Sequence, residues 1–148
     1  MNAQTVTAAP IAPVADARVP MVGALRVLLL TEAAAALALT IFLSMAASTA
    51  RDVLAGDVGR STEVTLQFAA GAAFLFAIFA AIASRGARRR RGWAWTMAAI
   101  LQVVLAIGTG VAVMTAEWHP VYLVGFGLAA LVMLVLSTTP VRRALGKE

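Results

Sequence analysis

The chain has 148 residues, of which 61% are hydrophobic and 13% charged, and its mean hydropathy is +0.89. Soluble domains are closer to half apolar, so this composition excludes a soluble globular domain and indicates an integral membrane protein. The formal net charge of +5 lies in segments that flank apolar runs, where membrane insertion requires it, so we expect no nucleic-acid partner. With no cysteine and one histidine, we expect neither a disulfide, nor a metal site, nor a cofactor.

Residues 1–22 are rich in alanine, threonine, valine and proline and lack helical periodicity, which predicts a flexible tail. The apolar segment 25–48 predicts a first membrane helix, because about 20 residues suffice to cross the hydrocarbon layer. A cleaved signal peptide is the alternative, since Ser48-Thr49-Ala50 before Arg51 is a small-residue sequence typical of cleavage sites. The apolar run exceeds the roughly 7–15 residues of a signal core, which favours a retained helix.

Residues 49–62 carry two arginines, two aspartates and two glycines, and they predict a neutral loop on the far side of the membrane. A second helix is expected at 63–84, with Ser61 or Thr62 as its cap and Glu63 in its first turn. Its bulky phenylalanines and its run of alanines indicate one face toward lipid and another for packing.

A basic loop follows at 84–92, with arginines at positions 85, 88, 89, 90 and 91. Two more helices are predicted at 93–115 and 121–138, the first entered through tryptophans that suit the headgroup level. Residues 23–140 would then form a four-helix transmembrane domain, followed by a basic tail at 141–148.

The charge distribution predicts the topology of this domain. All but Arg51 and Arg60 of the 12 lysines and arginines fall on one side of a four-helix arrangement. Positive residues accumulate on the cytoplasmic side, so we expect an all-α integral membrane four-helix bundle with both termini in the cytoplasm. The preference for arginine over lysine, with abundant alanine and valine, suggests a bacterial inner (plasma) membrane.

Three polar residues stand out within the apolar segments. Glu32 lies about 9 Å along the helix from Arg26, at the ~1.5 Å rise of an α-helix. An acid near the centre of a membrane helix costs about 2.5–3.5 kcal/mol, so it normally has a polar partner. We expect Glu32 to meet Thr96 and Gln102, because the first and third helices share their cytoplasmic ends. Two alternatives remain open: a structural hydrogen bond, or a proton and substrate site.

Small residues four positions apart predict close helix contacts. Gly108 and Ala112 form one such pair in the third helix, and Gly125 and Ala129 form another in the fourth. They could pack within one chain or against a partner helix.

Two polar segments outside the helices have alternative interpretations. Arg85, Arg88, Arg89, Arg90 and Arg91 act either as a topological stop signal or as a contact for anionic lipids. Trp118-His119-Pro120 is more typical of an interfacial turn than of a ligand site.

Two resemblances follow from these residues. The fourth helix and its exit, Gly125 to Leu136 followed by Pro140-Val141-Arg142-Arg143-Ala144-Leu145-Gly146, resemble the endings of small uncharacterised four-helix membrane proteins of actinobacteria. Four helices with one glutamate in the first also resemble small multidrug-resistance transporters, in which that acid couples drug and proton binding. The resemblance to these transporters implies a coupling role for Glu32, but the first helix lacks the aromatic residues that accompany that family's glutamate.

The sequence contains no paired carboxylates, no nucleophile with a nearby base and no phosphate-binding loop, so we expect no enzyme. The leading hypothesis is a non-catalytic multi-pass membrane protein that acts as an accessory or assembly subunit through its small-residue helix faces. The alternative is a small proton-coupled transporter that uses Glu32.

Overall fold

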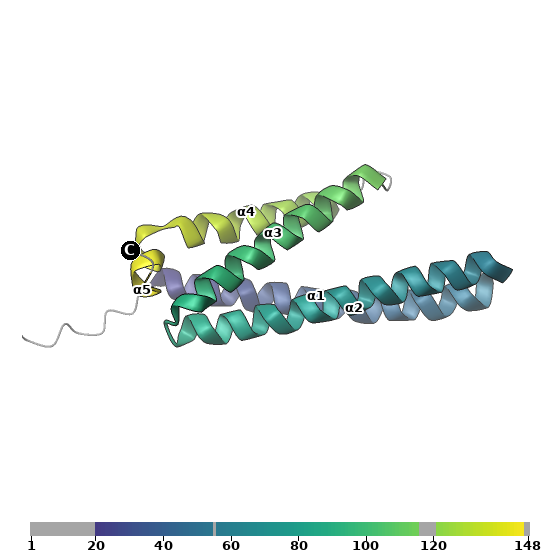
Figure 1. Ribbon diagram of the computed structural model, residues 1–148, viewed down its shortest axis with the longest axis horizontal. Coiled ribbons are helices and arrows are strands. Elements are labelled where there is room, and N and C mark those ends of the chain that lie inside the picture. Colours follow the sequence, from purple (N-terminus) through teal and green to yellow (C-terminus); the bar gives the residue numbers. More distant parts are fainter. Residues whose placement is uncertain (1–19, 55, 116–120, 147–148) are drawn as a thin grey trace, which may run out of the picture.

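The computed structural model describes residues 20–54, 56–115 and 121–146, and these residues form five helices (Figure 1). The helices, in chain order, are α1 (Pro20–Val53), α2 (Gly56–Arg88), α3 (Gly92–Thr115), α4 (Val121–Ser137) and α5 (Thr139–Ala144). No strand occurs in the described part of the chain, so the prediction of an all-α protein is confirmed.

Three of these helices, α1, α2 and α3, are long and apolar enough to cross a membrane. Helix α4 is also apolar but has 17 residues, which corresponds to roughly 26 Å at the rise of an α-helix. The structure therefore supports a membrane protein on the strength of three helices, with a shorter fourth beside them.

Helices α1 and α2 form a long antiparallel hairpin (Figure 1). Two long side-chain hydrogen bonds mark its register. Thr40 Oγ1 donates to the carbonyl of Ala36 at 2.9 Å and is shared with that of Ala70 at 3.4 Å, and Ser84 Oγ donates to the carbonyl of Arg26 at 3.5 Å. Arg26 and Thr40 on α1, and Ala70 and Ser84 on α2, are each 14 positions apart. This spacing is two heptads, and the heptad is the repeat of a coiled coil. On α2 the seam consists of small residues spaced by three and four, Ala70, Ala73, Ala77, Ala80, Ser84 and Ala87. These small side chains let the two backbones approach closely.

The predicted loop at 49–62 is wrong. Helix α1 continues to Val53 and α2 begins at Gly56, so residues expected in a loop extend the hairpin instead. Ser61 and Thr62 do not cap a helix, because both hydroxyls donate to the carbonyl of Val58 inside α2. Arg51, Asp52, Asp57 and Arg60 are exposed on these helix ends, so the charged side chains do not require a loop.

The arginine segment is also mostly helical, in contrast to the predicted loop at 84–92. Helix α2 runs to Arg88, and the chain reverses within three residues. Arg90 has a φ of +50°, Arg90 N donates to the carbonyl of Ala87, and Arg91 N donates to that of Gly86. This is the Schellman arrangement, in which a left-handed residue closes the helix and satisfies its last carbonyls.

The chain after α4 folds back, where the sequence indicated a basic tail. Residues Thr139–Ala144 form α5, with Thr138 at its N-cap and Pro140 in its first turn. Val141 and Leu145 are fully buried in the core. The apolar side of this short helix therefore anchors the C-terminal segment while Arg142 and Arg143 stay exposed.

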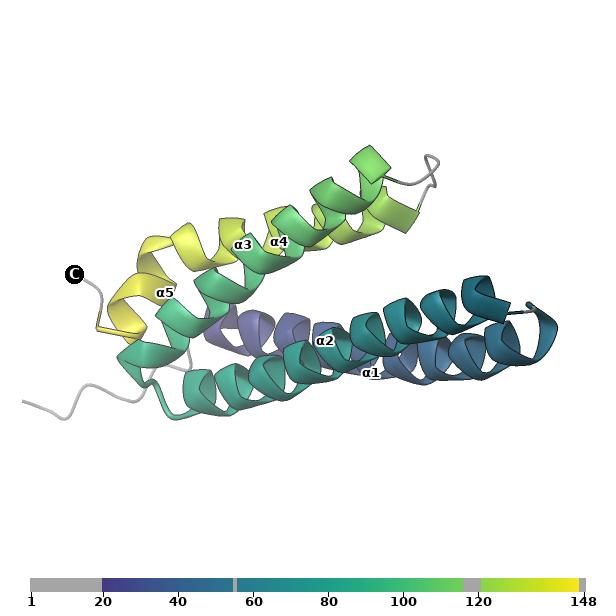
Figure 2. The same cartoon turned by 45° about the vertical axis from the view of Figure 1, so that its right-hand side comes forward.

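The α1/α2 and α3/α4 hairpins meet at one end of the molecule and diverge toward the other, as two views agree (Figures 1 and 2). The shared core lies at the joined end, where α5 also packs. It contains Leu25, Leu29 and Ala33 of α1, Ala80, Ala83 and Ala87 of α2, Ala94, Ala98 and Leu101 of α3, Val132, Val135 and Leu136 of α4, and Val141 and Leu145 near α5. Past Gln102, the side chains of α3 described up to Met114 are half-buried or exposed.

Candidate functional site

The structure joins Glu32 of α1 to Gln102 of α3. Gln102 Nε2 donates a hydrogen bond of 2.9 Å to Glu32 Oε2, across 70 residues of chain. Glu32 is 2% exposed and Gln102 is 1% exposed, so the bond lies inside the protein. The contact expected between these two residues from the shared ends of the first and third helices is present.

The surroundings of the pair are apolar. Leu29 and Ala33 flank Glu32 on α1, Ala98 and Leu101 flank Gln102 on α3, and all four are buried. The other carboxyl oxygen of Glu32, Oε1, and the amide oxygen of Gln102, Oε1, are buried and have no hydrogen-bond partner. A buried oxygen without a hydrogen-bond donor lowers the stability of the fold, so each of these two oxygens would be stabilised by a donor.

Thr96 does not join this pair. Its side chain lies on the exposed side of α3, whereas Gln102 lies on the buried side. The six steps along the helix from Thr96 to Gln102 turn it by about 600°, which places the two residues on different faces. The predicted cluster of three residues is therefore a pair.

The two small-residue motifs have different environments. A Cβ added at Gly125 would lie 3.1 Å from Thr109 Oγ1, so Gly125 allows α4 to approach α3 within the chain. Ala129, one turn further along, is buried. Gly108 is exposed and has no neighbouring atom within 4 Å of such a Cβ, and Ala112 is half-buried.

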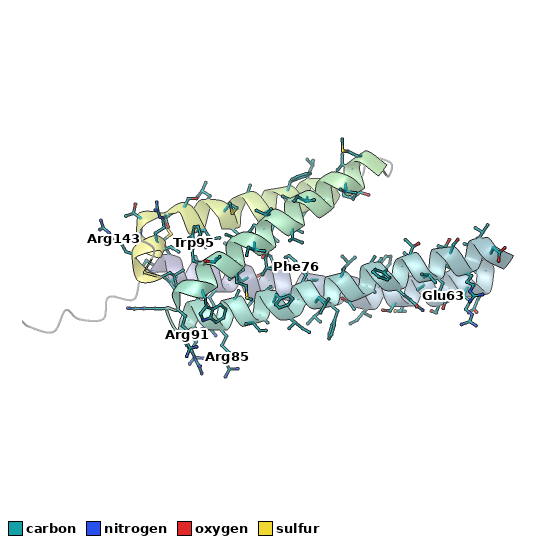
Figure 3. All side chains as sticks on the ribbon, in the orientation of Figure 1. Glu63, Phe76, Arg85, Arg91, Trp95 and Arg143 are labelled. Carbon is teal, nitrogen blue, oxygen red and sulfur yellow. The ribbon has the colours of Figure 1, made fainter. Side chains whose placement is uncertain are left out.

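The arginines gather at the joined end of the hairpins. Arg85, Arg91 and Arg143 project from this end, whereas Glu63 lies near the far end of the α1/α2 hairpin (Figure 3). Arg88, Arg89 and Arg90 are exposed at the same turn. At the far end, Arg51 and Glu63 form an ion pair at 3.7 Å.

A shallow hollow of about 500 Å³ lies at the basic end, lined by Arg90, Thr139, Pro140, Arg143 and Ala144. Two further hollows are apolar and lie on the outer faces of the α1/α2 hairpin, one around Gly71 and one around Met45. The Glu32–Gln102 pair borders none of these three. Within residues 20–54, 56–115 and 121–146, no group of three or more histidine or acidic side chains could hold a metal ion.

Sequence reasoning missed two features that shape the site. One is the extent of the alanine seam of α2: a packing face was expected from its alanines, but not the alternating spacing of three and four that continues from Ala70 to Ala87. The other is the contact of Gly86 with Trp93, which packs the start of α3 against the end of α2. Trp118, His119 and Pro120 lie outside the described residues.

In comparisons with known proteins, no protein-family model, no curated protein and no solved structure matches the chain.

Proposed function

We propose that the protein is a non-catalytic multi-pass membrane protein that serves as an accessory or assembly subunit. In this role it binds helices of a partner membrane protein at the exposed face of α3 around Gly108. The observation that carries the proposal is that Gly108 is open to the outside, whereas Gly125 is used to pack α4 against α3. Glycine on an outer helix face, where no neighbour of the same chain approaches, is typical of contacts between chains in membranes.

Larger apolar side chains flank Gly108 on the exposed face of α3. Val104 and Val111, one turn before and after Gly108, are each 54% exposed, and Ile107 is 62% exposed. These larger side chains rise on both sides of the glycine, so a partner helix can approach the α3 backbone there. Packing of this kind stabilises helix pairs in lipid, where burial of apolar surface alone supplies little driving force.

We further propose four membrane crossings with both termini in the cytoplasm of a bacterial cell. The arginines gather at the joined end of the hairpins, where α1 begins and α5 packs. Because positive residues remain on the cytoplasmic side, this arrangement supports the proposed topology. Helix α1 supplies buried core residues along with α2, α3 and α4, which supports its retention rather than its removal as a signal peptide. The exposed arginines would also contact anionic lipids, at about 1 kcal/mol for each residue near the surface.

The test is affinity purification of the full chain from its native membrane in mild detergent, with mass spectrometry and native mass determination. A stoichiometric membrane-protein partner is expected. Gly108→Leu should reduce its recovery about tenfold, equivalent to ~1.4 kcal/mol of binding free energy.

The matched control is Gly71→Leu on α2, where an added side chain also meets no atom of this chain within 4 Å. It should leave partner recovery unchanged. Equal recovery with Gly108→Leu and the unaltered protein would show that the partner does not bind at Gly108. A homo-oligomer without a partner would favour the second candidate.

The second candidate is a small proton-coupled transporter, assembled as a homo-oligomer, in which Glu32 alternates between a proton and a substrate. It is favoured by the burial of an acidic side chain inside a membrane-length helix. This candidate requires Glu32→Gln to abolish pH-dependent efflux while the fold stays intact. An accessory role predicts no such efflux.

A further inference from the structure

The Glu32–Gln102 pair connects the two hairpins of the fold. Glu32 belongs to the α1/α2 hairpin and Gln102 to the α3/α4 hairpin, and the bond between them is 2.9 Å long. Gln102 is also the last fully buried side chain along α3 as far as Met114. The pair therefore lies at the boundary between the shared core and the region where the hairpins separate.

The pattern of hydrogen bonds at this pair is incomplete in a specific way. One amide hydrogen is donated to Glu32 Oε2, and the two remaining oxygens, Glu32 Oε1 and Gln102 Oε1, have no donor. An ionised carboxylate and an amide oxygen are both acceptors, so neither satisfies the other. Exchanging the amide oxygen and nitrogen of Gln102 does not help, since the pair would still present more acceptors than donors.

No charged group in the described chain offsets a negative charge at Glu32. Helices α3 and α4 carry no charged residue, and those of α2 lie toward its two ends. On α1, Arg26 is exposed and Arg51 pairs with Glu63 at the far end, while Arg142 and Arg143 of α5 are exposed. Tyr122, at the start of α4, is only partly buried and lies at the other end of that helix from the core. An ionised Glu32 would be a buried charge with a single hydrogen bond from a neutral amide, which is unfavourable.

We propose that Glu32 carries a proton on Oε1 and donates it to Gln102 Oε1, forming a neutral acid–amide pair with two hydrogen bonds between α1 and α3. One added proton supplies the missing donor for both oxygens at once. The same two atoms that lack partners are the ones this bond would join. The site is thus a proton-binding site, and the proton completes the link between the hairpins. This assignment is independent of the accessory role proposed above.

The experiment is infrared spectroscopy of the full chain reconstituted in lipid at neutral pH, in normal and heavy water. The difference spectrum between the unaltered protein and Glu32→Gln should contain the carbonyl band of a protonated carboxylic acid, and this band should shift in heavy water. If Glu32→Gln instead removes only carboxylate bands, Glu32 is ionised and the proposal is overturned.

Gln102→Leu tests the second hydrogen bond. With the amide gone, the carboxylic acid band should shift to higher frequency or disappear, because the acid has lost its partner. An unchanged band would show that the acid is protonated without the amide, and the paired arrangement would be rejected.

Glu32→Gln should keep the fold, because two amides also form two hydrogen bonds with each other. If that variant does not fold, labelling glutamate with ¹³C in the unaltered protein identifies the same band without any substitution. A glutamate-labelled acid band then supports the proposal, and its absence contradicts it.

Discussion

At the scale of single residues, the smallest side chains decide where the helices meet. Gly86, near the end of α2, is buried beneath Trp93 at the start of α3. A Cβ at this position would lie 2.7 Å from the indole ring and 2.9 Å from the Cβ of Ala94. The ring can turn slightly, but the Cβ of Ala94 moves only with its backbone, so the contact leaves little room for a methyl group.

We therefore expect Gly86→Ala to destabilise the protein by about 1–3 kcal/mol, the usual cost of overpacking a tight core. Thermal unfolding in detergent, followed by circular dichroism, measures this change. Gly23→Ala is the matched control, because Gly23 also lies in a helix but has no atom within 4 Å of an added Cβ. Its stability should equal or slightly exceed that of the unaltered protein, since alanine favours helix more than glycine does. Equal stability of Gly86→Ala and the unaltered protein would contradict this account.

At the scale of elements, the α1/α2 hairpin depends on a seam of alanines. The hydrogen bonds of Thr40 to Ala70 and of Ser84 to Arg26 place Ala33 across from Ala77, midway between them. Ala33 is 6% exposed and Ala77 is 2% exposed. Two methyl groups facing each other set a short distance between the helices, so a larger side chain must push them apart.

Ala77→Leu should lower the free energy of unfolding by about 1–3 kcal/mol, because the seam has no space for the added atoms. The neighbouring substitution Ile78→Leu is the control, since Ile78 is 38% exposed on the outer side of α2 and keeps its volume. Denaturant unfolding of both variants in the same detergent compares them. If Ile78→Leu lost as much stability, the loss in Ala77→Leu would come from the helix propensity of leucine and not from packing in the seam.

At the scale of the whole molecule, two hairpins share one basic end. The arginines of the α2–α3 turn and of α5 cluster where the core lies, and the opposite tips separate (Figures 1 and 3). Exposed apolar side chains cover the length of the hairpins, including Phe42, Phe68 and Met114 at 66%, 82% and 89% exposure. Such a surface is stable in lipid, whereas in water it would favour aggregation.

The proposed topology predicts which end reagents reach from outside the cell. The chain has no cysteine, so single cysteines report their positions without further substitutions. In intact cells, a membrane-impermeant maleimide should label Val58→Cys, which lies at the far tip of the hairpin and is 64% exposed in the unaltered protein. It should label Thr139→Cys at the basic end only after the cells are permeabilised. The opposite labelling pattern would invert the topology.

The sequence by itself determined the class of the protein and the approximate position of its helices along the chain. Apolar segments of membrane length, bounded by arginines, are sufficient for that, because each segment must satisfy its own backbone hydrogen bonds in lipid. Glu32 and Gln102 could be singled out for the same reason, since polar side chains in such segments are costly and require partners. Gly108 and Gly125 were equally visible, but the sequence did not distinguish their environments.

Only the tertiary structure decided which of these residues meet and where the helices end. Thr96 and Gln102 are both polar residues of α3, yet the rotation of the helix places Thr96 outside and Gln102 in the core. The segment around Asp57 and Arg60 is polar, which fits a loop and a helix projecting beyond the membrane equally well. Val141 and Leu145 gain their burial from contacts with distant parts of the chain, and no local pattern records that. The physical reason is common to all three: hydropathy reports the transfer of a segment into lipid, whereas the choice of partner depends on the packing of helices against one another.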